Sequence, residues 1–306
     1  MTRWRMTLDQ LRIFVAVAEG EHMTRAARHL KLTQSGVSAA IAMLESQCAT
    51  PLFDRVGRQI RLTEAGRVLL QEAQDILARV EAAKAALAEI DGLQRGTLRL
   101  RASLTIASYW LPKHLVKFRH AYPQIAVQLG IDNTANVAKA VLDGTAEIGF
   151  VEGEVSHPLL RQQIVATDQM AIVVAGRHPL ARRKRITSDD LKTLQWVLRE
   201  DGSGTRSMFE AALRGMGMRL ADLDVVLELP SNEAIKTAVA AGAGATAISR
   251  SVVSADLAGG KLARLPLTLP RRAYSALYHR DRHRSRTARA LLALIAPAGR
   301  PPAHTG

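Results

Sequence analysis

The chain has 306 residues, 47% of them hydrophobic, and a formal net charge of +14 at pH 7. This length predicts about two domains of ordinary size with buried cores. No run of about 18 uncharged apolar residues occurs, which excludes a transmembrane helix, and the missing apolar leader predicts a cytoplasmic protein. The single cysteine, Cys48, cannot form an internal disulfide, and we expect it to have a packing role rather than a redox role.

The positive charge indicates a polyanionic partner, but it is spread along the chain. Residues 1–62 hold nine basic and five acidic residues, a net charge of +4. Much of the remaining excess lies in two runs, RHPLARRKR (177–185) and RRAYSALYHRDRHRSRTAR (271–289). Charge alone therefore does not locate a nucleic-acid site, and we expect both runs to be solvated surface rather than a second such site.

Three short helices are predicted first. Apolar residues recur at helical spacing over 8–18, TRAARHL (24–30) predicts a second helix, and Thr33 is a suitable N-cap for a third. A turn of a few residues before the third helix is typical of a helix-turn-helix. The next segment, PLFDRVGRQIRLT (51–63), predicts a small β-hairpin with arginine at its tip, which is a wing.

The third helix lies in LTQSGVSAAIAMLE (32–45) and has an unusual outer face. Val37, Ile41 and Leu44 form the stripe of a buried helix side. The opposite face lacks the Lys and Glu of an ordinary solvated surface and carries only small side chains, namely Ser35, Ser38, Ala39 and Ala42. Such a face allows the helix backbone to come close to a partner.

A long helix is predicted from about Thr63 to Ile90. Its apolar residues are spaced alternately four and three apart, at Leu69, Ala73, Ile76, Val80, Ala83, Leu87 and Ile90. This 3.5-residue period is typical of a coiled-coil seam and predicts a dimer. The alternative is that the stripe packs on its own domain.

The pattern changes after a predicted hinge, DGLQRG (91–96). Strand-like and helix-like segments then alternate, which predicts an α/β module with largely parallel sheets. Ligands bind beyond the carboxyl ends of the strands in such folds. The last eleven residues, APAGRPPAHTG, are expected to be a disordered tail.

With these parts in this order, the chain resembles a LysR-type transcriptional regulator. The resemblance covers nearly all of the chain and is most specific in LDQLRIFVAVAEGEHMTRAARHLKLTQSGVSAAIAMLESQCATPLFDRVGRQIRLTEAG (8–66). It is looser in LPKHLVKFRHAYP and VLDGTAEIGFVEG. The resemblance implies a two-domain α+β fold: a winged helix-turn-helix (1–63), a linker and dimerisation helix (64–90), a hinge (91–96), a periplasmic-binding-protein-like α/β effector domain (97–300) and a tail (301–306).

The resemblance also implies that the third helix enters the major groove, which is about 12 Å wide, so that small side chains let it sit deep. The residues implied in DNA contact are Thr33, Gln34, Ser35 and Ser38 in the helix and Arg55 and Arg58 in the wing. A glutamine can pair bidentately with adenine. Simple helix capping is the alternative role for each Ser and Thr.

The chain departs from the family pattern at three positions. Ala39 stands where several relatives carry Arg, Gly36 lies early in the helix, and His22 replaces the usual Ser cap of the second helix. One base contact is therefore expected to be missing, and recognition of the operator is expected to depend more on DNA shape than in those relatives.

The effector domain would consist of a first subdomain (about 97–166 and 268–300) and a second (about 167–267), joined near 164–168 and 265–269, with a ligand in the cleft between them. Small polar groups follow four predicted strands: Ser103 and Thr105; Asn133 and Thr134; Gly202, Ser203, Gly204, Thr205 and Arg206; Ser231 and Asn232. Hydroxyls, free N–H groups and helix dipoles favour an anion, to which Arg206 could add a charge-assisted contact. Helix capping alone is again the alternative. Similar GSGTR and DNT segments in family members that govern sulfur or carbon assimilation imply a small oxyanion, carboxylate or phosphorylated metabolite.

No Gly-x-Ser-x-Gly, His-Glu-x-x-His or Walker A motif is present, and the nine histidines are scattered. We therefore expect no enzyme activity, cofactor or metal site. A constitutive DNA-binding regulator without a ligand stays open as an alternative, whereas a solute-binding protein would leave residues 1–90 unexplained. The resemblance implies dimers that pair into tetramers, double-stranded DNA and a small effector as partners, and recruitment of RNA polymerase.

Overall fold

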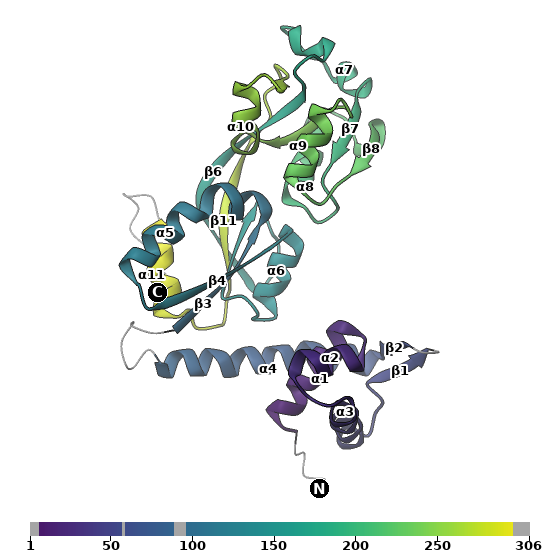
Figure 1. Cartoon of the computed structure of the whole chain (residues 1–306), viewed down its shortest axis with the longest axis vertical. Helices are drawn as coiled ribbons and strands as arrows, with labels where there is room; N and C mark the ends of the chain where they lie inside the picture. The colour runs from purple at the N-terminus through teal and green to yellow at the C-terminus, as the bar shows by residue number, and fades with distance from the viewer. Residues whose placement is uncertain (1–5, 57–58, 89–95, 296–306) are drawn as a thin grey trace. The chain divides into compact units, whose positions relative to one another are not determined.

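The computed structural model describes residues 6–56, 59–88 and 96–295. The chain divides into two compact units, Met1–Leu87 and Ala88–Gly306 (Figure 1). No helix among the described residues is both long enough and apolar enough to cross a membrane.

The first unit is a helix-turn-helix with a wing. Its elements are α1 (Leu8–Gly20), α2 (Met23–Leu30), α3 (Gln34–Cys48), the antiparallel hairpin β1 (Phe53–Val56) and β2 (Gln59–Leu62), and α4 (Glu64–Ala88). Each of the first three helices has a side-chain N-cap, from Thr7, His22 and Thr33. His22 therefore caps α2 through Nδ1, 3.4 Å from the Arg25 backbone nitrogen, in place of the serine expected from the family.

The core of this unit lies between the three helices and the start of α4. Phe14, Val37, Ile41 and Leu44 are buried in it, so the predicted inner stripe of the third helix is confirmed. Cys48 packs against the same core, and burial together with the charge of Glu45 raises the pKa of its thiol. A thiol with a raised pKa is less reactive, in keeping with the packing role predicted for it.

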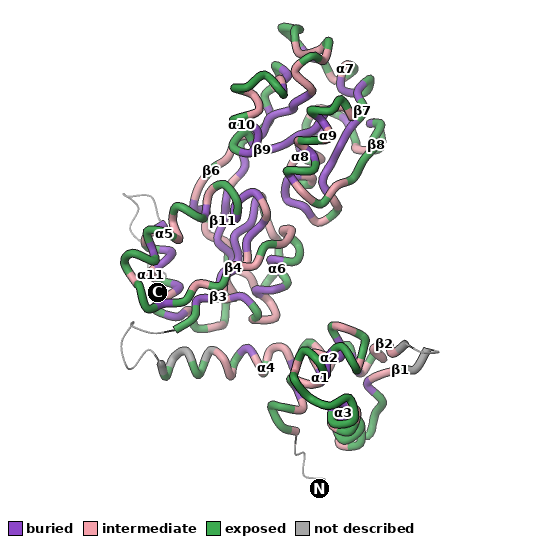
Figure 2. Tube along the Cα trace, in the orientation of Figure 1, coloured by how far each residue is buried: buried purple, intermediate pink, exposed green. Residues whose placement is uncertain are grey.

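The predicted apolar stripe of α4 is buried at its start and exposed farther along. Leu69 packs against the core of the first unit and Ala73 is fully buried there, so the first part of the stripe belongs to its own domain. Farther along, Ile76 is 38% exposed and Leu87 is 67% exposed. Ile90 lies outside the described residues. The seam prediction is therefore wrong for the first turns of α4, whereas Ile76 and Leu87 of the same stripe are exposed; Figure 2 colours the helix by burial.

The second unit contains two lobes. Lobe 1 comprises β3 (Gly96–Ser103), η1 (Ile106–Trp110), α5 (Leu111–Ala121), β4 (Ile125–Asp132), α6 (Thr134–Leu142), β5 (Ile148–Glu152) and α11 (Arg286–Ile295). Lobe 2 comprises η2 (Pro179–Arg182), α7 (Ser188–Lys192), β7 (Gln195–Leu198), α8 (Gly204–Gly215), η3 (Leu220–Asp222), β8 (Asp224–Glu228), α9 (Asn232–Ala240), β9 (Thr246–Ser249), α10 (Arg250–Ala258) and β10 (Leu262–Arg264). The strands β6 (Leu160–Ala175) and β11 (Arg271–His279) join them.

The main sheet has the strand order β10-β6-β11-β5-β3-β4. Strand β3 is parallel to β4 and β5, but β11 is antiparallel to both β5 and β6. The expectation of largely parallel sheets is therefore wrong around the two joining strands. Strand β11, which comes last in the chain, lies between β5 and β6 in the sheet and runs against both of them, so the antiparallel pairing of lobe 1 comes from this one strand.

Strand β6 changes partner along its length. Leu160 to Gln169 pair with β11, whereas Met170 to Val173 pair with β9 of lobe 2. The connection between the lobes thus falls between Gln169 and Met170, just beyond the predicted crossing at 164–168.

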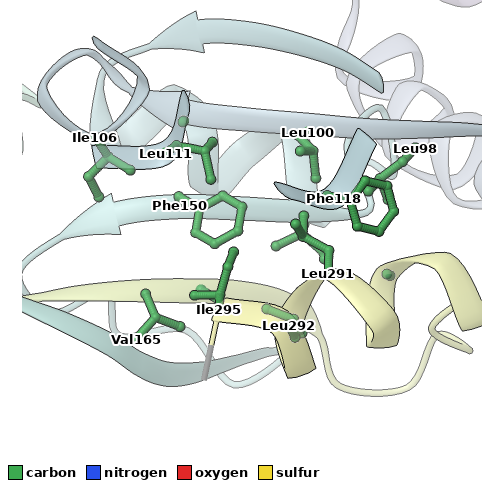
Figure 3. Packing of buried hydrophobic residues seen from close by; sticks show 14 of the residues in the cluster. Leu98, Leu100, Ile106, Leu111, Phe118, Phe150, Val165, Leu291, Leu292 and Ile295 are labelled. Atoms are coloured by element: carbon green, nitrogen blue, oxygen red, sulfur yellow. The ribbon is translucent and has the colours of Figure 1, made fainter. Parts of the chain in front are cut away.

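Each lobe has its own apolar core. In lobe 1, Leu100, Phe118, Phe150 and Leu292 are buried between the sheet and the helices that cover it (Figure 3). In lobe 2, Trp196 is fully buried, 4.7 Å from the ring of Phe209 between centroids. Two separate cores let the lobes behave as bodies joined by two strands.

Candidate functional site

The outer face of α3 is open to solvent. Thr33, Gln34 and Ser35 are exposed and Ser38 is half-buried. Ala39 and Ala42 continue this exposed face along the helix. A helix face this slim can approach the floor of a major groove closely.

Hydrogen bonds already occupy part of this face. The Thr33 hydroxyl accepts from the Gly36 backbone N–H at 3.1 Å and from the Ser35 hydroxyl at 3.2 Å, so the capping role does exist. A Cβ at Gly36 would lie 3.0 Å from the Thr33 Oγ1, so a larger residue there would require a small shift of the capping side chain. The side-chain amide of Gln34 donates to the Ser38 hydroxyl at 3.2 Å, so both predicted DNA-contacting side chains are engaged with each other.

The wing is fixed to α3 by Glu45, which sequence reasoning missed. Its carboxylate accepts from the backbone N–H groups of Leu52 at 2.8 Å and Phe53 at 3.2 Å. Arg55 lies on β1, where its backbone pairs with Ile60, and Arg58 lies outside the described residues. The Glu45 bonds set the start of the wing relative to α3.

A second set of polar residues lies at the carboxyl ends of β3, β4 and β5, which are neighbours in the sheet. Ser103 ends β3 and is buried, Asn133 follows β4 and caps α6, and Glu152 ends β5 and is buried. This edge is where a fold with parallel strands places its ligands.

Lobe 2 meets this edge through the N-termini of α8 and α9. The Asn232 amide donates to the Thr105 hydroxyl at 3.2 Å, and the Ala135 backbone N–H donates to the Gly202 carbonyl at 3.3 Å. A Cβ at Gly204 would lie 2.6 Å from the Thr134 Oγ1, so only glycine lets α8 approach so closely. The structure therefore brings most of the predicted effector residues together.

Ser203 and Ser231 complete the predicted set. Ser231 caps α9, accepting from the Ala234 N–H at 3.4 Å, which is the alternative role expected for it. Ser203 is buried at the start of α8 but makes no capping hydrogen bond. The first N–H groups of α8 thus have no acceptor from the cap residue.

Arg206 does not have the position predicted for it. Its guanidinium donates to Glu210 at 3.0 Å, to the Arg199 carbonyl at 3.2 Å and to Glu228. Burial lowers its pKa, but the hydrogen bonds to the two carboxylates outweigh burial and raise it. The prediction that this charge is directed at a ligand is therefore not supported by its contacts.

Arg272 holds the central position instead. It belongs to the run predicted to be solvated surface, yet only 1% of it is exposed. Its Nε donates to Asp168 at 2.8 Å and its Nη1 donates to the Thr205 hydroxyl at 3.0 Å. Its Nη2 lies 3.9 Å from a Glu152 oxygen. The nearby carboxylates outweigh burial and raise the pKa of this guanidinium, so it stays charged.

Three buried polar atoms at this edge have no hydrogen-bond partner: Ser103 Oγ, Thr134 Oγ1 and Arg272 Nη2. Buried polar atoms are nearly always paired in folded proteins. Their presence at the ends of neighbouring strands, beside the uncapped start of α8, indicates a place prepared for a polar ligand.

A further contact between the lobes involves Tyr109 on the π-turn η1, which donates to Glu233 at the start of α9. Burial and the hydrogen bond to Glu233 raise the pKa of Tyr109 to about 12. Sequence reasoning missed this pair because nothing in the local pattern links residues so far apart. Among the described residues, no group of three or more His, Cys, Asp or Glu side chains could hold a metal ion.

Two family models match the chain. The bacterial regulatory helix-turn-helix protein model of the lysR family matches residues 8–67, and the LysR substrate binding domain matches residues 91–300. The chain belongs to the LysR family. It is a LysR-type transcriptional regulator with a DNA-binding helix-turn-helix and an effector-binding domain.

Two relatives of this LysR-type regulator are similar over nearly all of this chain, and one solved structure is similar over its effector domain. An uncharacterized HTH-type transcriptional regulator, YeiE of Escherichia coli K12, is 37% identical over 97% of this chain and 99% of its own. A probable RuBisCO transcriptional regulator of Trichormus variabilis is 35% identical over 95% of this chain and 88% of its own. The regulatory domain of Synechocystis PCC6803 CcmR, solved in complex with 2-PG, is 26% identical with a TM-score of 0.60, covering 66% of this chain and 96% of that one.

Proposed function

We propose that this LysR-type regulator is switched by a small anion bound between the two lobes, at the carboxyl ends of β3, β4 and β5. The observation that carries the proposal is the uncapped N-terminus of α8, with the unpartnered hydroxyl of Thr134 beside it. Backbone N–H groups at a helix start point toward an anion, and the helix dipole favours negative charge there.

The ligand contacts that we propose come from both lobes. Ser103 Oγ and Thr134 Oγ1 would donate from lobe 1, and the first N–H groups of α8, at Gly204 and Thr205, would donate from lobe 2, next to the buried Ser203. Arg272 Nη2 would supply a charge-assisted bond. Asn133, Ser231, Asn232 and Thr105 would position the helix starts through the caps and inter-lobe bonds described above. Arg206 would brace α8 against Glu228 rather than bind the ligand.

The binding step would act on the equilibrium between arrangements of the two lobes. A ligand shifts such an equilibrium only by its difference in affinity for the two states. Contacts donated by both lobes supply that difference, because they can form together only when the lobes are close. The regulatory domain of CcmR, which is similar to this chain with a TM-score of 0.60, was solved in complex with 2-PG, and this supports a small-molecule effector for this chain.

For DNA, we propose that Thr33, Gln34, Ser35 and Ser38 face the major groove and that Arg55 and Arg58 of the wing contact the backbone and the adjacent minor groove. The exposed, slim face of α3 supports this assignment. We also propose that dimers form through the exposed part of α4, where Leu87 leaves its side chain in solvent, and that dimers pair through their effector domains. RNA polymerase recruitment in the cytoplasm would follow from the altered DNA complex.

A thermal-unfolding screen of the full chain tests the effector proposal. The probes are inorganic phosphate, sulfate, small mono- and dicarboxylates and 2-PG, compared with neutral and cationic compounds of similar size. A ligand at 100 times its Kd stabilises the native state by about 2.7 kcal/mol and raises the unfolding midpoint. Ser103→Ala is expected to abolish the shift, whereas Ser254→Ala, at an exposed serine of α10, leaves it intact.

The screen has a contradicting outcome. A neutral or cationic compound that raises the midpoint, with no response to any anion, would show that the helix N-termini do not select the ligand. An unchanged DNA footprint with a bound anion would favour the constitutive regulator instead.

A further inference from the structure

The two basic runs in the effector domain differ in how the fold uses them. In the run 271–289, Arg272 is buried, Arg282 donates to the carbonyls of Val141 at 2.9 Å and Leu142 at 2.6 Å, and the Arg284 guanidinium lies over the Tyr278 ring at 4.2 Å. These arginines therefore cap a helix and pack on the sheet. The positive charge of these three residues serves the fold, while the other four arginines of the run are exposed, namely Arg271, Arg280, Arg286 and Arg289.

The run 177–185 has a different structure. It connects β6 to α7 at the end of lobe 2 marked by α7 (Figure 1). Leu180 and Ala181 pack against the lobe 2 core and Ile186 is buried in it, so the segment is anchored. Its five basic side chains, here named the basic ridge, are all exposed: Arg177, Arg182, Arg183, Lys184 and Arg185.

The charge of the basic ridge is largely uncompensated. Arg183 pairs with Asp190 at 2.7 Å. Within the described parts of the chain, no ion pair joins the other four members of the ridge to an acidic side chain. Lys261 is also exposed. Its backbone carbonyl accepts from the Gly176 N–H at 2.9 Å, which places Lys261 next to the start of the ridge.

We propose that the basic ridge is a second DNA-contacting surface, which binds backbone phosphates outside the base pairs read by α3. The proposal rests on the DNA-binding function of the chain. Arginine and lysine side chains that bind phosphates supply affinity without reading sequence. An anchored segment loses little further backbone entropy when it binds.

The composition of the ridge favours DNA over an acidic protein. Protein interfaces rely on buried aromatic, Met or large apolar anchors, with Arg among them. None of the large apolar side chains exposed in the described part of the chain lies between 177 and 187. The ridge offers cations alone, which matches a phosphate backbone.

Salt dependence of DNA binding tests the proposal. The full chain is titrated with a promoter fragment that it binds, from 50 to 300 mM KCl, and log K is plotted against log salt. The triple variant Arg182→Gln, Lys184→Gln, Arg185→Gln is compared with wild type. Each phosphate contact contributes about 0.9 to the slope, so the slope should decrease in magnitude by about 2 to 3 per bound protomer.

The matched control removes the same charge from lobe 1 with Lys139→Gln, Arg161→Gln and Arg289→Gln, all at exposed positions. It should leave the slope within about 0.5 of wild type, since long-range charge is screened within about 10 Å at 0.1 M salt. Both variants should unfold at the wild-type temperature because the replaced side chains are exposed.

Two results would overturn the proposal. The first is a ridge variant whose slope equals that of the control. The second is unchanged DNA binding with reduced transcription in a purified system, which would assign the ridge to an acidic protein partner. A wild-type chain that binds no promoter fragment would instead refute the DNA-binding function itself, so the two failures are distinguishable.

Discussion

The buried guanidinium of Arg272 gives a quantitative prediction. It lies where β11 and β6 pair beside the connection between the lobes, and it bonds Asp168 at 2.8 Å and Thr205 at 3.0 Å. Arg272→Met removes the cation and leaves two carboxylates, Asp168 and Glu152, buried with side-chain exposures of 8% and 2%. We expect a large destabilisation of the effector domain.

The magnitude follows from that geometry. Breaking a buried ion pair by removing one partner costs about 3–5 kcal/mol, because the remaining charge has lost its compensation. For a unit of about 200 residues, each kcal/mol shifts the unfolding midpoint by about 2–4 °C, so the shift should be about 10 °C. Arg183→Met is the matched control, since Arg183 and Asp190 form a partly exposed pair worth about 1 kcal/mol or less.

Thermal unfolding of the full chain by circular dichroism measures both variants. The triple variant Arg272→Met, Asp168→Asn, Glu152→Gln should recover part of the lost stability, because no uncompensated charge stays buried. A midpoint for Arg272→Met within 2 °C of the control, or no recovery in the triple variant, would refute the assignment of these charges as one coupled cluster.

Three more outcomes are expected. Ser103→Ala should lose the effector-dependent change in the DNA footprint and keep wild-type affinity for DNA without effector; equal loss of both would contradict its place in the ligand site. Leu87→Glu should shift the sedimentation profile toward monomer, since burial of a leucine contributes about 1.5–3 kcal/mol; an unchanged profile would place the dimer contact elsewhere. Burial, with Lys113 and Lys117, lowers the pKa of His114, so the unfolded state binds its proton more readily and stability should fall as pH drops below 6.5. His114→Gln should flatten that fall in unfolding midpoints between pH 7.5 and 5.5, and an identical pH profile would contradict the reasoning.

Local patterns predicted the first unit well. Helices α1 to α3 and the wing hairpin are determined by apolar spacing, caps and a proline, all of which act over a few residues. The packing partner of the apolar stripe on α4 was harder to predict, because a 3.5-residue period is the same whether a helix packs on its own domain or on a second subunit. The burial of Ala73 decides for its own domain, and only the tertiary structure could show it.

The effector domain shows where such reasoning stops. Ser103, Thr105 and Asn232 could be predicted as neighbours, since ends of adjacent strands and starts of helices converge in this class of fold. The sequence could not predict that Arg206 pairs with carboxylates while Arg272 lies buried at the strand ends. Their places depend on which strand lies beside which, and an arginine in a basic run has the same local signature whether it is exposed or buried.

Selection of binding sites from random duplex DNA tests the central claim most directly. The full chain, at 150 mM salt, should enrich a defined half-site, and Gln34→Ala should relax preference at one base position by about 1–3 kcal/mol of discrimination while nonspecific affinity stays unchanged. Enrichment of no sequence by the wild type, or an identical motif from the variant, would contradict the assignment of α3 as the recognition helix.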